Sequence, residues 1–212
     1  MTPIAVALES TAKRTFAWAI DWPGWCRGAK TEEAAIDALA EYRDRYAVVA
    51  EVAGLRFPGA DAFDIVERAP GTATTDFGAP NVIVASDRRP LTAAQARREA
   101  DLLAAAWRVL DDVAATAPPT LRKGPRGGGR DRDDVVRHVT EAEHSYAAKL
   151  GIRRRDLGDK PFRDAVLEAL RAARSGDALV PKGWPPRSMT RRMAWHVLDH
   201  AWEIEDKSSP AP

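Results

Sequence analysis

The sequence predicts an α+β protein in which a small α/β domain, residues 1–88, precedes an up-down four-helix bundle, residues 89–206. Three observations lead to this prediction. Short β-branched and apolar runs bounded by Gly, Pro and Asp gather before residue 88. The apolar spacing changes to a helical period after Pro90, and four helical stretches then follow one another. We expect the last residues, 207–212, to form a disordered tail.

The first part of the chain has the pattern of a βαβ-type unit. Apolar or alternating runs predict four strands, at residues 4–8, 15–20, 63–68 and 81–85. One helix is expected between the second and third strands. Thr31 is its N-cap, and Glu32 and Glu33 follow in the first turn, where the helix dipole favours carboxylates. This helix should end near Gly54.

The second part of the chain has the pattern of a helical bundle. Thr92 and Gln95 form a capping box that begins the first bundle helix, and its apolar stripe lasts to about Thr116. Residues 117–132 are rich in Pro, Gly and Arg, which predicts a mobile loop or lid. The other three helices are expected at residues 133–150, 161–175 and 188–206.

Composition favours a cytoplasmic globular protein. Of the 212 residues 45% are hydrophobic and 30% are charged, with a formal net charge of +1. This balance gives no general attraction to nucleic acid, and no apolar run is long enough to cross a membrane. The single cysteine, Cys26, cannot form an intrachain disulfide and is interpreted as a packed apolar group rather than a nucleophile.

Three histidines are candidate metal ligands. His196 and His200 are four residues apart, so both imidazoles lie on one helical face, and His138 falls in the apolar stripe of the second bundle helix. Three neutral imidazoles suit a divalent transition metal and leave one coordination position open. The alternative is that the pair arises by chance and the histidines are ordinary core or surface groups. His144 projects about 240° away from His138 and is not expected at the same site.

Other residues of the last helix are weighed against ordinary roles. Glu203 either orients a ligand or moves a proton, or it is a solvated carboxylate. Arg192 either binds a substrate carboxylate or is an exposed basic residue. Trp195, Leu198 and Trp202 project opposite the histidines, so we expect this second apolar face to be buried against the N-terminal domain or against a second subunit in a homodimer.

The bundle resembles a known superfamily. The segments RHVTEAEHSYAAKLG and RRMAWHVLDHAWEIED resemble the paired motifs of DinB-like metal-dependent bundles, which include mycothiol-dependent maleylpyruvate isomerase and other thiol transferases. The resemblance covers about residues 90–206 and implies that His138, His196 and His200 bind one divalent ion. Neutral imidazole suits zinc, nickel, copper or iron, and of these we expect zinc or nickel. The resemblance also implies a small-molecule substrate and mycothiol as a co-substrate.

The N-terminal segment FAWAIDWPGWCRGAKTEEAAIDALAEY is similar to the strand, Pro-Gly turn and helix of HicB-like antitoxin domains. This resemblance implies a small regulatory or substrate-contacting domain.

Two functional hypotheses follow from these patterns. The first is a metal-dependent enzyme, a thiol S-transferase of the mycothiol type or a hydrolase, in which the ion lowers the pKa of a bound thiol or water. The second is a non-enzymatic regulatory or binding protein with a HicB-like domain and a structural bundle.

Overall fold

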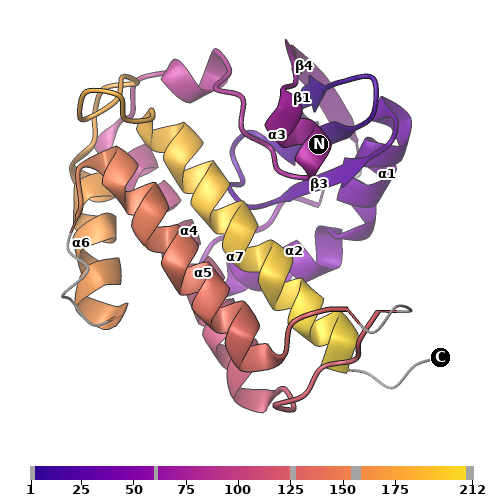
Figure 1. The fold of residues 1–212 in the computed structure, drawn as a ribbon. Helices are drawn as coiled ribbons and strands as arrows, with labels where there is room; N and C mark the ends of the chain where they lie inside the picture. The colour runs from indigo at the N-terminus through magenta and orange to yellow at the C-terminus, as the bar shows by residue number, and fades with distance from the viewer. Residues whose placement is uncertain (1–2, 60–61, 125–127, 154–158, 209–212) are drawn as a thin grey trace.

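A computed structural model describes residues 3–59, 62–124, 128–153 and 159–208. Within these residues the chain forms a four-stranded mixed sheet, seven α-helices and two short 3-10 helices, which confirms the α+β prediction. The sheet and the first helices occupy one side of the molecule, and the four long helices occupy the other (Figure 1).

The sheet is built from the N-terminal part of the chain. Its strands are β1 (Ile4–Ser10), β2 (Thr15–Ala19), β3 (Cys26–Ala29) and β4 (Phe63–Pro70). Their order is β3-β2-β1-β4, with β2 antiparallel to β1 and β3, and β4 parallel to β1. The strands predicted at residues 4–8, 15–20 and 63–68 are confirmed. The strand β3 and the short helix α3 (Ala73–Phe77) were not predicted.

The strand predicted at residues 81–85 is wrong. This segment runs outside the sheet and ends in the 3-10 helix η1 (Ser86–Arg88). The N–H groups of Asn81 and Val82 donate to the carboxylate of Glu9, at 3.0 and 2.9 Å, instead of to a neighbouring strand. A buried carboxylate therefore satisfies the backbone that a sheet would otherwise pair.

The single helix predicted after Thr31 is two helices, α1 (Glu32–Glu41) and α2 (Arg43–Val52). The Thr31 side chain accepts a hydrogen bond from the N–H of Ala34, which confirms the N-cap. Tyr42, at φ −89° and ψ 6°, separates the two helices, and its ring packs at 5.0 Å from that of Trp202. The two helices form the crossover between β3 and β4, as expected for a βαβ-type unit.

The four long helices pack beside one another. They are α4 (Ala93–Thr116), α5 (Arg132–Ala147, continued by η2, Ala148–Leu150), α6 (Asp159–Ala172) and α7 (Pro186–Ser208). The predicted capping box of Thr92 and Gln95 is confirmed. α7 contacts both α4 and α5, and Figure 1 shows α5 and α7 side by side. α7 continues to Ser208, and residues 209–212 of the expected tail lie outside the described residues.

The second apolar face of α7 is buried against the N-terminal part of the same chain. Trp195 meets Phe16 edge to face, with ring centroids 6.0 Å apart, and Leu198 is fully buried. Gly24 has a φ of +97°, and a Cβ placed on it would lie 2.7 Å from Leu198 Cδ1. A second subunit is not needed to cover this face, and one buried cluster includes residues of both the sheet and the bundle. The domain boundary after residue 88 and the homodimer stay predictions.

None of the described helices is both long enough and apolar enough to cross a bilayer.

Candidate metal centre

Three histidines meet between α5 and α7. His138 comes from α5, and His196 and His200 come from successive turns of α7. One ligand atom from each lies within 4.8 Å of the others. The ring centroids are 5.1 Å apart for His138 and His196, 4.9 Å for His138 and His200, and 4.7 Å for His196 and His200. The structure thus brings together the three residues that the sequence analysis selected.

Local helical geometry and packing together produce this cluster. The spacing of four residues places His196 and His200 on one face of α7. Val135 and Val139 of α5 and Met193 and Val197 of α7 are all buried, so apolar side chains fix the two helices against each other. His138 is one residue before Val139 and lies at the edge of the same contact.

Burial favours the neutral form of two of the imidazoles, those of His196 and His138. His196 is only 8% exposed, and burial lowers the pKa of its ring to about 2, with smaller contributions from His200 and His138. Burial also lowers the pKa of His138, and the charge of Arg130 adds to this effect. Neutral rings keep the nitrogen lone pair that a metal ion requires.

Glu203 orients His200. Nδ1–H of His200 donates to Glu203 Oε2 at 2.7 Å, and Lys207 Nζ donates to the other carboxylate oxygen. The hydrogen bond from His200 is the main reason why the pKa of Glu203 is lowered to about 2. Because Nδ1 carries the proton, Nε2 of His200 is left as the ligand atom.

The donor set fits a divalent transition metal. Nε2 of His138 lies 3.3 Å from Nε2 of His196. Two imidazole nitrogens on a tetrahedral zinc ion are about 3.3 Å apart, given Zn–N bonds of about 2.0–2.1 Å. Nδ1 of His196 is buried and has no hydrogen-bond partner among the described residues, which departs from the usual arrangement of a metal-bound histidine. The rings of Tyr146 and Trp195 lie beside His196 instead, at 5.6 and 6.1 Å.

Arg192 lies one turn before His196 and is tied to the N-terminal part of the chain. Its guanidinium donates to the carbonyl oxygen of Pro80 and lies 4.8 Å from the Trp195 ring centroid and 5.5 Å from that of Tyr146. Its charge contributes to the low pKa of His196. Arg192 is therefore near the site, and substrate binding by it stays a prediction.

Two residues set aside in the sequence analysis lie apart from the cluster. The ring of His144 packs on Phe162, with centroids 4.2 Å apart. Cys26 is fully buried in a cluster that includes Trp18 and Trp195, and burial raises the pKa of its thiol. A buried neutral thiol is a poor nucleophile.

The loop of residues 117–132 is attached to the end of α7 over its described part. The N–H of Arg122 donates to the carbonyl oxygen of Lys207 at 3.0 Å, and Leu121 is buried. Asp131 accepts from Lys123 Nζ at 2.7 Å. Residues 125–127 lie outside the described residues, and closure of a lid stays a prediction.

The same loop reaches the histidines at its far end. Gly129 and Arg130 line a cavity of about 340 Å³ together with His138 and with Asp134, Arg137 and Glu141 of α5. One imidazole of the cluster thus faces an open, polar space that carries two arginines.

Sequence reasoning missed one neighbour of the site. Lys207 follows Glu203 by four residues, a spacing that indicates an ion pair on a helix and was available in the sequence. Tyr146 shares the apolar stripe of His138, and Arg130 belongs to the Arg-rich loop expected near the site; both approach the histidines in the structure.

Comparison of the chain with models of known protein families, with curated proteins and with solved structures finds no match.

Proposed function

We propose that this protein is a metal-dependent enzyme of the DinB-like type, and specifically a thiol S-transferase that acts on a small molecule. The observation that carries the proposal is the convergence of three imidazoles, from His138, His196 and His200, at one point between α5 and α7. The positions of these histidines in the motifs of the second and fourth bundle helices support the DinB-like assignment. The run of β2, the Pro-Gly turn, β3 and α1 supports a HicB-like origin for the N-terminal part.

The proposed ion is zinc or nickel, because neutral imidazole nitrogens suit both. An ion held by three protein ligands would supply a Lewis acid with an open position, which lowers the pKa of a coordinated thiol or water. Mycothiol is the first candidate thiol, on the strength of the DinB-like resemblance.

Residues of the chain prepare the site for this chemistry. Burial holds His196 in its neutral form. Glu203 fixes the ring of His200 and selects the tautomer whose Nε2 is left as the ligand atom. The neutral form of His196 and the orientation of His200 are therefore both present in the folded chain before substrate binds.

The cavity that opens on His138 carries charges of both signs. Arg130 and Arg137 line it together with Asp134 and Glu141, and Arg137 donates to Asp134 at 2.6 Å. Arginine forks match the geometry of carboxylates, so in this proposal Arg130 is the residue that draws a small acid toward the cluster. In this proposal Arg192, one turn before His196, holds a carboxylate of the bound substrate.

Metal analysis tests the proposed site. Purified protein should hold one equivalent of zinc or nickel after dialysis, and His138→Ala, His196→Ala and His200→Ala should each lose it, because two imidazoles rarely hold a divalent ion tightly. His144→Ala is the matched control and should keep the metal, since His144 packs on Phe162. Retention of one equivalent by His196→Ala would show that the ligand assignment is wrong.

A second experiment tests the reaction class. Cobalt-substituted protein is titrated with mycothiol and with other small thiols while the visible spectrum is recorded. A sulfur-to-metal charge-transfer band is expected if a thiol coordinates the ion. If no thiol binds at about millimolar concentration while simple esters or amides are hydrolysed, the transferase proposal fails and a hydrolase replaces it.

A further inference from the structure

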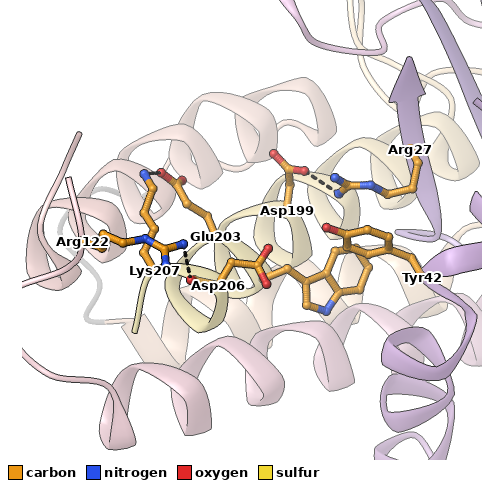
Figure 2. A pocket seen from close by; sticks show the side chains of 8 residues that line it. Arg27, Tyr42, Arg122, Asp199, Glu203, Asp206 and Lys207 are labelled. Carbon is orange, nitrogen blue, oxygen red and sulfur yellow. Dashed lines mark hydrogen bonds and ion pairs between the residues drawn. The ribbon is translucent and has the colours of Figure 1, made fainter. Parts of the chain in front are cut away.

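A second cavity lies between the sheet side of the molecule and the last turns of α7 (Figure 2). Its volume is about 370 Å³, which is within the range of small-molecule sites. Three segments that are distant in the sequence build it: β3 and the α1–α2 junction, the loop after α4, and α7. We call it the rear cleft.

An aromatic surface forms one side of the rear cleft. Tyr42 and Trp202 meet edge to face, with centroids 5.0 Å apart. The guanidinium of Arg27 lies 3.8 Å above the Tyr42 ring and donates to Asp199 at 2.9 Å. This corner is held in place by a cation–π contact and an ion pair, so it is preorganised for a ligand.

Charged groups of both signs surround the aromatic surface. Figure 2 shows the pair of Arg27 and Asp199 at one end of the cleft and Arg122, Glu203 and Lys207 at the other. Asp206 also lines the cleft. The lining contains three cations, Arg27, Arg122 and Lys207, and three carboxylates, Asp199, Glu203 and Asp206. Its formal charge is therefore zero. Asp206 also pairs with Arg45, which lies outside the lining, so a ligand's ammonium group would share this carboxylate with Arg45.

This lining favours one chemical class of ligand. A singly charged molecule would compete with an existing ion pair and leave one sign of the lining without a partner. A zwitterion meets both signs, because its ammonium group pairs with carboxylates and its carboxylate pairs with arginine or lysine. An apolar body between or beside these charges would cover the rings of Tyr42 and Trp202.

We propose that the rear cleft binds a small zwitterion with an apolar side chain, that is, a free amino acid or a molecule of the same chemistry. The ammonium group is placed against Asp206 and Asp199, and the apolar side chain lies on Trp202. Glu203 lines the cleft and also holds His200, so the cleft and the metal centre share one carboxylate. The proposal does not depend on the metal, and it is tested with metal-free protein.

Calorimetric titration of the full-length, metal-free protein with L-phenylalanine tests the proposal. Saturable binding of one equivalent is expected. Phenethylamine, which lacks the carboxylate, and 3-phenylpropionate, which lacks the ammonium group, should each bind at least about tenfold more weakly, because each leaves one set of partners unused. No saturable binding up to about 10 mM would overturn the proposal, as would equal affinity for all three compounds.

Charge-removing variants place the binding in the cleft. Asp206→Asn and Asp199→Asn keep the side-chain shape and should each weaken L-phenylalanine binding about tenfold. Asp101→Asn is the matched control, because Asp101 forms a similar surface pair with Arg171 on α6 and does not line the cleft. Two independent cleft variants guard against misfolding of either one, and circular dichroism checks both. Wild-type affinity in the two cleft variants would overturn the assignment.

Discussion

Substitution of Glu203 should weaken metal binding in two separable steps. Glu203 Oε2 accepts a hydrogen bond from His200 Nδ1 at 2.7 Å, while Lys207 pairs with the other carboxylate oxygen. The carboxylate therefore has two effects: its position fixes the ring, and its charge makes the imidazole a stronger ligand. Glu203→Gln keeps an oxygen acceptor but removes the charge. Glu203→Ala removes both.

The size of each step follows from the geometry. Loss of an outer partner of a metal-bound histidine lowers metal affinity about 10–100-fold. We assign about tenfold, or about 1.4 kcal/mol, to loss of the charge in Glu203→Gln. We assign about a hundredfold, or about 2.7 kcal/mol, to Glu203→Ala, because the ring of His200 is then also free to turn.

Competition with a chromophoric chelator measures these affinities near neutral pH. Glu205→Gln is the matched control, since Glu205 lies on the same helix and its charged neighbours are Arg45 and Asp206 rather than a histidine. Its metal affinity should stay within about twofold of wild type. If Glu203→Ala binds the metal as tightly as wild type, the proposed role of Glu203 is refuted, and His200 is not held as a ligand through Nε2.

Three further predictions concern the fold around the site, each measured by urea denaturation of metal-free protein. Asp87→Ala leaves the buried guanidinium of Arg191 without its partner and should lower the free energy of unfolding by about 3–5 kcal/mol. Asp101→Ala breaks an exposed pair and should lower it by less than about 1 kcal/mol. Equal losses in the two variants would contradict this prediction. Gly24→Ala should destabilise the folded protein by about 1–3 kcal/mol, because residue 24 has a positive φ and a Cβ there would clash with Leu198. The loss should be smaller in a Leu198→Ala background. If the effects of the two substitutions are strictly additive, the clash with Leu198 is excluded. Burial holds the pKa of His196 near 2, below the ordinary 6.5, so the folded protein binds fewer protons than the unfolded chain and loses stability as the pH falls below about 6.5. Between pH 7 and pH 5 the free energy of unfolding of His196→Leu should therefore fall by about 2 kcal/mol less than that of wild type. Identical losses in the two proteins would refute this prediction.

Local patterns predicted the elements that depend on local physics. The capping box at Thr92 and the N-cap at Thr31 formed as expected, because each needs only a side-chain oxygen and a backbone N–H three residues later. The positions of the four long helices also followed from apolar periodicity. Such features are encoded within one or two turns of chain.

The wrong strand at residues 81–85 and the missed strand β3 both lie where residues distant in the sequence determine the hydrogen bonding of the backbone. The segment 81–85 has the β-branched composition of a strand, but the carboxylate of Glu9, more than 70 residues earlier, takes its hydrogen bonds. The strand β3 has the sequence CRGA, which carries no strand signal, and it forms because β2 lies beside it. Neither the hydrogen bonds to Glu9 nor the pairing of β3 with β2 can be inferred from the spacing of residues in the sequence.

The metal centre depends both on the local geometry of one helix and on the packing of two helices that are distant in the sequence. The distance between His196 and His200 is set by one turn of α7, whereas the position of His138 relative to that pair depends on how α5 packs against α7. The opposite face of α7 is fixed to the sheet through Trp195 and Leu198, so α7 is held from both sides. A disturbance of the α5 contact should therefore displace His138 and leave the α7 pair intact. Variants of this interface would weaken metal binding by removing one ligand, while the helix that carries the other two remains in place.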